Sequence, residues 1–512
     1  MRHAFGFALF VGWFVSQAPA HAQVPKKTER EIVEAYQKQL QFAAATASPS
    51  VACIIVSRSE HYPKIVNPGD VPGKLGEFDR AEFLKNNASP ERTKLADWLD
   101  LANRQMFPDH GYVGGVVIDP SGLVLTPYHV IDGATKIYVI LPRRGKDVVG
   151  SYADICAADS RSDLAVLKLI HPPASLKAIT IAEVRLFNQD KQKATIGQGE
   201  MIGLMACPYT SGFAFDGPSI AFGGISKVCH RLPPPTELKT RDDLNVSESY
   251  YKYGVLLEHT VQLNAAVTGG VLINLNGEML GLTTSSAVVY NKELGPGYAI
   301  PMDETVRRVI DVLRKGEEVE YGFLGMGPDK STSTIHTLTH YGPAEIAGLR
   351  VLDTITHVND TPINNFQDLL LHVGSALAGM KVKLTILRNG QEKVFYLTLG
   401  KFRPAQPFIA SVRPDPVFGL RVDYLDIVAR QNKLPPDGLV TGVNVREVTA
   451  NSPAANKFKG LGDNPTNWII THVNGTPIAT PSEFYTAAKG QPTVKLTLRD
   501  LSEAKPRELI LP

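Results

Sequence analysis

The sequence predicts a mainly β protein with several domains, and three observations support this prediction. The chain has 512 residues, which is too many for a single hydrophobic core, because domains usually hold about 100–200 residues. From residue 51 onward, short apolar runs rich in β-formers alternate with turn residues, a pattern typical of a barrel or sandwich. The segment 355–363 recurs as 470–478, which indicates two related modules in the C-terminal part.

The composition is that of an ordinary globular protein with many turns. Apolar residues make up 43% of the chain and charged residues 20%, with 43 glycines and 36 prolines. The formal net charge is +2 and there is no long basic run, so no nucleic-acid partner is predicted and peptides remain a natural ligand. The histidines and cysteines lack ligand spacing such as Cys-x-x-Cys, and we therefore expect no metal and no other cofactor.

The N-terminus has the pattern of an export signal. Arg2 and His3 precede the apolar run 4–15, and small residues follow at 18–22, so we predict a signal peptide over 1–22 with cleavage after Ala22. The alternative is an uncleaved anchor, but the apolar run is shorter than the roughly 20 residues that span a bilayer. The mature chain is thus expected to be exported, periplasmic or secreted, with no membrane span.

Export permits disulfide bonds, and the sequence leaves their pairing open. The four cysteines are Cys53, Cys156, Cys207 and Cys229. They can form two bridges in three alternative pairings, or they can remain buried thiols.

The regular elements are expected in the following order. A helix over 28–42 begins with a Thr28–Glu31 capping box and serves packing or oligomer contacts. Strands are predicted at 51–56, 115–118, 123–126 and 164–169. Two long surface loops interrupt them at 61–110, with one helix near 92–106, and at 231–253. A helix from Glu304 that stops at Gly316 closes the first domain.

Three segments hold the residues with catalytic chemistry. His129 follows the strand 123–126, where a lone histidine is more often structural than catalytic. Asp163 precedes the strand 164–169, where an aspartate can simply cap a turn. Thr268 precedes Gly269 and Gly270, and on its own it can be a packed residue whose hydroxyl bonds nearby backbone.

Together with 275–281 and 297–301, these segments resemble the HtrA/Deg family of trypsin-like proteases, in which histidine, aspartate and serine occur in that order. The resemblance covers roughly 51–316 and implies a double β-barrel. It assigns His129 as the base, Asp163 as the carboxylate that orients it, and Thr268 to the place of the nucleophile. A serine protease needs such a base within hydrogen-bond reach of a hydroxyl.

The chain departs from the family pattern at the nucleophile. The family reads Gly-Asn-Ser-Gly-Gly, whereas this chain reads Ala-Val-Thr-Gly-Gly at 266–270. The β-methyl of Thr268 restricts the attacking rotamer. The oxyanion hole would use the backbone amides of Ala266 and Thr268, and a Cβ at Ala266 disfavours a left-handed turn there. We therefore predict weakened or absent proteolysis, and the alternative is an endopeptidase that uses Thr268.

The two C-terminal repeats resemble PDZ domains, which bind the C-terminus of a peptide through a loop of two apolar residues around glycine. The candidate loops are Phe323-Leu324-Gly325-Met326 and Val417-Phe418-Gly419-Leu420. The expected organisation is a signal peptide at 1–22, a trypsin-like double β-barrel at 23–316, a PDZ (α+β) domain at 317–402, a linker at 403–416 and a second PDZ domain at 417–512.

The resemblance also implies partners. They are unfolded polypeptides or peptide C-termini, and further copies of the chain in a homo-oligomer, often a trimer in this family. The alternative for either PDZ copy is that it packs against another subunit and binds no peptide.

Overall fold

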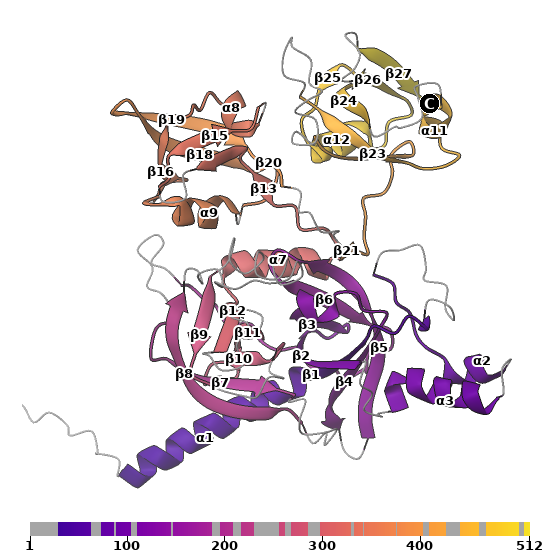
Figure 1. Ribbon diagram of the computed structural model, residues 1–512, viewed down its shortest axis with the longest axis vertical. Coiled ribbons are helices and arrows are strands. Elements are labelled where there is room, and N and C mark those ends of the chain that lie inside the picture. The colour runs from indigo at the N-terminus through magenta and orange to yellow at the C-terminus, as the bar shows by residue number, and fades with distance from the viewer. Residues whose placement is uncertain are drawn as a thin grey trace, which may run out of the picture.

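The structure is a computed structural model, and Figure 1 shows two β-barrels with two smaller modules beyond them. It describes residues 29–62, 73–85, 89–103, 110–144, 147–186, 195–207, 217–229, 255–261, 268–284, 297–328, 332–340, 342–374, 376–402, 409–425, 441–459, 467–500 and 506–512. The predicted signal peptide and the predicted loop 231–253 lie outside these residues.

The first barrel contains the four predicted strands together with two further strands, β4 and β5. In order along the sheet the strands are β5-β4-β1-β2-β3-β6, and pairing of β5 with β6 closes the barrel. Alternate residues of β1 point inward, where Ala52, Ile54 and Val56 are buried in the barrel core. The strands are β1 (Val51–Ser57), β2 (His110–Asp119), β3 (Leu123–Pro127), β4 (Lys136–Arg144), β5 (Asp147–Asp159) and β6 (Leu164–Leu169).

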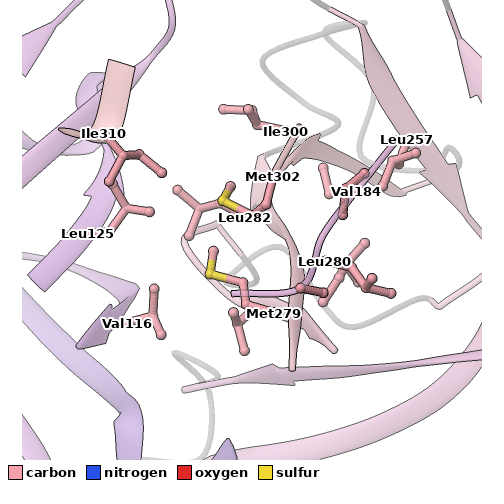
Figure 2. Close-up of a cluster of buried hydrophobic side chains, with 14 of the residues drawn as sticks. Val116, Leu125, Val184, Leu257, Met279, Leu280, Leu282, Ile300, Met302 and Ile310 are labelled. Carbon is pink, nitrogen blue, oxygen red and sulfur yellow. The ribbon is translucent and has the colours of Figure 1, made fainter. Parts of the chain in front are cut away.

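The second barrel closes in the order β10-β11-β12-β9-β8-β7. Its core extends across the boundary between the barrels: Figure 2 shows Val116 and Leu125 of the first barrel in one cluster with Met279 and Leu282 of the second. The two barrels are therefore packed through a shared apolar layer. The strands are β7 (Met201–Ala206), β8 (Ser219–Cys229), β9 (Leu256–His259), β10 (Val271–Ile273), β11 (Met279–Thr284) and β12 (Gly297–Pro301).

Helices close both ends of this two-barrel domain. The N-terminal helix α1 (Glu29–Ala47) projects from the barrels in Figure 1, and near its C-terminal half Gln39 Nε2 donates to the Leu275 carbonyl at 2.8 Å. The helix α7 (Glu304–Arg314) begins where Asp303 accepts a hydrogen bond from the Val306 amide. It ends before Gly316, as predicted, and Arg314 contacts Asp119 of β2 at 2.6 Å.

The long insertion predicted at 61–110 folds against the outside of the first barrel. It contains α2 (Arg80–Lys85), α3 (Pro90–Leu99) and a short 3-10 turn η3 (Leu101–Asn103), so the helix predicted near 92–106 begins and ends earlier than expected. Tyr62, Phe78 and Phe83 form its small core. The Asp154 carboxylate of β5 accepts from the amides of Leu75 and Gly76, each at 2.7 Å, and so attaches the insertion to the barrel.

The two C-terminal modules share one order of eight elements, and the first has in addition two short strands, β13 and β20, which pair with each other. The first contains β13 (Gly322–Phe323), β14 (Met326–Pro328), β15 (Ile335–Leu338), α8 (Pro343–Ile346), β16 (Thr354–Val358), β17 (Thr361–Pro362), α9 (Phe366–Gly374), β18 (Lys381–Arg388), β19 (Gln391–Thr398) and β20 (Gly400–Lys401). The second contains β22 (Leu420–Tyr424), β23 (Val443–Val448), α11 (Pro453–Phe458), β24 (Trp468–Val473), β25 (Thr476–Pro477), α12 (Pro481–Ala488), β26 (Val494–Asp500) and β27 (Arg507–Leu511).

The sequence repeat folds alike in both modules. Asn359 and Asn474 follow equivalent strands and adopt left-handed φ values of +47° and +51°. Their amides donate to the carbonyls of Lys383 at 2.9 Å and Lys495 at 2.7 Å, respectively. Asparagine tolerates this conformation better than most residues, which accounts for its place in both copies.

The segment between the modules returns to the first barrel. Within the predicted linker 403–416, the strand β21 (Ile409–Ala410) pairs antiparallel with β5 through Ala157 and Ala158. The Val412 amide then donates to the Gly316 carbonyl at 2.9 Å. Among the described residues, we find no helix with the length and apolarity needed to cross a membrane.

Candidate active site

His129 and Asp163 lie at the same end of two paired strands. The strand β3 ends at Pro127, whose partner in β6 is Leu164, the residue after Asp163. The chain then turns into the short helix α4 (Tyr128–Ile131), and the Tyr128 amide donates to the Asp163 carbonyl at 2.9 Å. The β3–β6 pairing therefore brings together two residues that are far apart in the sequence.

The side chains of His129 and Asp163 form a direct ion-pair geometry. Nδ1 of His129 lies 2.8 Å from Oδ2 and 3.0 Å from Oδ1 of Asp163, whose Oδ1 also accepts from the His129 amide at 2.9 Å. The Asp163 side chain is only 2% exposed and the residue has a left-handed φ of +55°. A carboxylate held at Nδ1 favours the tautomer that leaves Nε2 as the basic nitrogen.

Thr268 opens a tight turn on the second barrel and is 7% exposed. Its carbonyl accepts from the Gly114 amide of β2 at 2.8 Å. The amide of the next residue, Gly269, donates to the Thr283 carbonyl at 2.9 Å. The Thr283 amide donates to the Gly270 carbonyl at 2.7 Å. The turn is thus fixed by backbone bonds on both sides.

Gly114 connects this turn to β3, the strand that precedes His129. The Gly114 carbonyl accepts from Thr126 Oγ1 of β3 at 3.0 Å, while its amide binds Thr268. Gly269 has a φ of +77°, and a Cβ there would overlap the Gly114 carbonyl. The two backbones approach so closely that only glycine fits at 269, and Thr268 consequently lies beside the β3 end from which His129 follows.

Ala266, the second expected donor of the oxyanion hole, lies outside the described residues. Within the described residues, no cluster of His, Cys, Asp or Glu side chains could hold a metal ion.

Arg161 is a residue of this region that sequence reasoning missed. It lies on the turn that carries Asp163, is 7% exposed, and places its guanidinium 4.1 Å from the Tyr321 ring and 4.8 Å from the Phe402 ring. Its Nη2 donates to the carbonyl of Gly374 at the end of α9, at 3.1 Å. Tyr321 also donates to Asp159 at 2.5 Å. No local pattern predicts these partners, because they lie more than a hundred residues away.

The loop predicted for peptide binding in the first module lies between β13 and β14. Leu324 is buried, and its carbonyl accepts from the Ala344 amide at the start of α8, at 2.9 Å. The Gly325 carbonyl accepts from Thr339 at 2.8 Å. Within the described residues, no backbone bond outside the helices and strands uses the amides of Leu324 or Gly325. The neighbours Phe323 and Met326 belong to the flanking strands.

The corresponding loop of the second module is closed on itself. Val417 and Leu420 exchange two backbone bonds, of 3.0 and 2.9 Å, around Phe418 and Gly419, which have φ values of +54° and +86°. The amide of Leu420 is therefore engaged within the turn. Ser452 packs directly against Gly419 from the other side.

Comparison with known proteins agrees with this architecture. Residues 114–282 match the trypsin-like peptidase domain and residues 322–399 match the PDZ domain. A probable periplasmic serine endoprotease, DegP-like, of Pseudomonas putida (strain W619) is 29% identical over 400 residues, which cover 74% of each chain. The periplasmic serine endoprotease DegP of Salmonella typhimurium is 27% identical over 395 residues, or 74% of this chain and 72% of its own.

A solved structure of the HtrA-type protease AlgW with a decapeptide covers 71% of this chain and 99% of its own, with 20% identity and a TM-score of 0.46. The fold and the matched regions define a trypsin-like peptidase domain followed by PDZ-type modules. In sequence and in domain order the chain is similar to the HtrA/DegP-like family. Its relatives are named periplasmic proteins, in agreement with the exported location predicted from the sequence.

Proposed function

We propose that this protein binds unfolded or C-terminal segments of other polypeptides in the periplasm and that its peptidase activity is weakened or lost. The observation that carries the proposal is the threonine at the nucleophile position, Thr268, in a turn that cannot readily rearrange. The Gly114 contact and the two bonds to Thr283 hold that turn on both sides.

The β-methyl of Thr268 is the first reason for reduced activity. A β-branched side chain has few χ1 rotamers, and Thr268 is only 7% exposed, so its methyl group is largely enclosed and restricts the hydroxyl further. The second reason is Ala266 in place of glycine, since losing one oxyanion donor lowers a rate by about 10²- to 10³-fold. Each change alone would slow acylation.

Peptide binding is assigned mainly to the first module. The amides of Leu324 and Gly325 are the groups that would receive a peptide carboxylate, and β14 offers the edge along which an extended peptide can add. In the second module the amide of Leu420 already donates to the Val417 carbonyl, so we expect this module to bind peptides more weakly.

Self-association is assigned to the N-terminal helix. The helix α1 exposes Ile32, Val33, Tyr36 and Phe42, each between 42% and 62%. Such exposed apolar side chains on a projecting helix fit contacts between copies of the chain, and we propose a homo-oligomer, a trimer by family likeness. Light scattering after chromatography would measure the mass; a monomer at micromolar concentration contradicts this assignment.

The second candidate is a working endopeptidase that uses Thr268 with His129 as base and Asp163 as orienter. The observation in its favour is the 2.8 Å contact between Nδ1 of His129 and Asp163, the contact that a catalytic pair requires.

Digestion of unfolded casein separates the two candidates. The chain should cleave casein no faster than its Thr268→Ala variant, with His129→Ala as a second control. Cleavage that disappears in both variants would instead establish the endopeptidase. The Thr268→Ser variant identifies the cause: a gain of cleavage points to the methyl group, and no gain points to the turn around Ala266.

Binding is measured separately with fluorescent peptides added to the full chain. We expect a peptide with a free C-terminus to bind more tightly than the same peptide with an amidated C-terminus, because the loop amides recognise the carboxylate. Equal affinity for the two peptides would contradict the assignment to the Leu324–Gly325 loop.

A further inference from the structure

Cys53 and Cys207 come from different barrels and meet at the boundary between them. Cys53 lies in β1, and its side chain points away from the barrel core into the cluster formed with the insertion, where it is 6% exposed. Cys207 follows directly after β7 of the second barrel and packs against the same cluster. Both are free thiols in the structure and belong to the same buried cluster, and the nearby Cys207 raises the pKa of Cys53.

Each cysteine is next to a residue that lies near the Thr268 turn. Cys53 is the cross-strand partner of Gly114, whose amide binds the Thr268 carbonyl. Cys207 follows Ala206, and a Cβ placed on Gly270 would approach the Ala206 side chain to 3.0 Å. A covalent bond between the two sulfurs would thus join the strands that hold the turn.

We propose that Cys53 and Cys207 form a disulfide bond that links the two barrels behind the Thr268 turn. The periplasm is an oxidising compartment in which adjacent cysteines form and keep such bonds. The inference concerns how the domain is held together, so it does not depend on whether the protein cleaves peptides.

Of the other two cysteines, the Cys229 side chain lies outside the described residues, and Cys156 has different neighbours. Cys156 lies elsewhere, with Ser411 Oγ and the Arg314 carbonyl each 3.9 Å from its sulfur. The Cys156 sulfur therefore contacts groups at the junction of β5 and the returning linker, and we expect it to remain a thiol.

The bond forms by exchange with a protein disulfide, the class of oxidant that periplasmic thiol oxidoreductases supply. The half-buried Cys207 loses its proton and its sulfur attacks the oxidant's disulfide, which releases one thiolate. The neighbouring Cys207 thiol, together with burial, raises the pKa of Cys53, so Cys53 reacts second. Its sulfur attacks Cys207 of the mixed disulfide and expels the second thiolate. Two cysteines are oxidised, one disulfide is reduced, and the oxidant's sulfurs take up both protons.

Peptide mapping of the full chain purified from the periplasm tests the pairing. Thiols are alkylated in denaturant without reductant, and the protein is digested under non-reducing conditions. We expect a linked peptide that contains Cys53 and Cys207, together with alkylated Cys156. Alkylation of both Cys53 and Cys207, also after incubation with oxidised glutathione, would overturn the proposal, as would a link between any other pair.

Thermal unfolding supplies an independent measurement. Reductant should lower the Tm of the native chain by about 5–10 °C, because a cross-link over a long loop restricts the unfolded chain. The Cys53→Ala/Cys207→Ala double variant should have the same Tm with and without reductant, whereas Cys156→Ala should keep the full decrease. An equal effect of reductant on the native chain and on the double variant would contradict the proposed bond.

Discussion

His259 lies inside the second barrel, on the strand that leads toward the Thr268 turn. It is 2% exposed and pairs with Gly297 of β12, which has no side chain and leaves room for the imidazole ring. Burial lowers the pKa of His259 to about 4. Neither ring nitrogen makes a full hydrogen bond to a described residue, and only the nearby Val261 backbone opposes the shift. The ring is therefore neutral at physiological pH.

The first prediction follows from this shifted pKa. In the unfolded chain the imidazole binds a proton near its ordinary pKa of 6.5, whereas the folded protein resists protonation until about pH 4. Acidification therefore favours the unfolded chain, and stability should fall between pH 6.5 and 4, by up to about 3 kcal/mol. Urea unfolding at several pH values measures this slope.

The control for this prediction is a surface histidine. We expect His259→Leu to flatten the dependence between pH 6.5 and 4, since the variant has no imidazole to protonate there. His171→Leu should retain the native slope, because His171 is 70% exposed in its contact with Glu77. An unchanged slope in His259→Leu would show that other groups cause the acid sensitivity.

At the scale of elements, the turn that carries Asp163 is joined to the first C-terminal module. Arg161 extends from this turn, stacks on Tyr321 and Phe402, and donates to the carbonyl of Gly374. Asp159 at the other end of the turn accepts from Tyr321. Burial raises the pKa of Tyr321, so its phenol stays protonated as the donor. The contacts connect the candidate catalytic pair with α9.

The second prediction is that Arg161 stabilises the junction of the first barrel and the first C-terminal module. Arg161→Ala should lower the free energy of unfolding by about 2–4 kcal/mol, because it removes a buried hydrogen bond and a desolvated cation–π contact. A double-mutant cycle with Phe402→Leu should give a coupling energy of about 1–2 kcal/mol. Arg185→Ala, at an exposed ion pair, is the control and should change stability by less than about 0.5 kcal/mol. Additive effects of the two changes would contradict the stacking role.

Local sequence patterns predicted the elements whose causes are local. The strand expected at 164–169 is β6 with the same bounds, and the helix from Glu304 ends before Gly316 as expected. The repeat 355–363 and 470–478 predicted two like modules for the same reason, because each copy specifies its own strand and turn.

Other features depend on partners that are distant in sequence, and these were not predictable. The strand β21 forms because its residues pair with the edge strand β5. The residues of β21 themselves have the pattern of a linker. The closed loop at 417–420 contains the expected apolar residues around glycine, but only its backbone bonds distinguish it from the open loop at 323–326. His129 and Asp163 were found because a family order of residues, and not local spacing, relates them.

At the scale of the whole molecule, a buried charge network joins the two C-terminal modules. The Lys401 side chain, at the end of the first module, is 2% exposed. Its Nζ lies 2.7 Å from Glu318, 3.0 Å from Glu320 and 3.2 Å from Asp423 of the second module. Burial pulls the pKa of Lys401 down, but the three carboxylates together raise it above its usual value. Arg446 adds contacts of 3.3 Å to Glu318 and to Asp423.

The third prediction is that Lys401 fixes the position of the second module on the first. Removing one partner from a buried ionic cluster leaves charge uncompensated and costs about 3–5 kcal/mol. Lys401→Met should thus lower the melting transition of the C-terminal part by roughly 10 °C in calorimetry. It should also increase the radius of gyration in small-angle scattering, because Glu318 and Asp423 then repel each other across the junction.

Lys495→Met is the matched control for this change. Lys495 contacts Glu508 at 2.7 Å, but the two side chains are 48% and 63% exposed, so the pair should contribute less than about 1 kcal/mol. Salt at about 1 M screens exposed charges within roughly 3 Å and should remove the effect of Lys495→Met while leaving most of that of Lys401→Met. A Lys401→Met protein with native scattering and native melting would show that other packing contacts, such as Tyr424 against Gly379, hold the modules together without the charges.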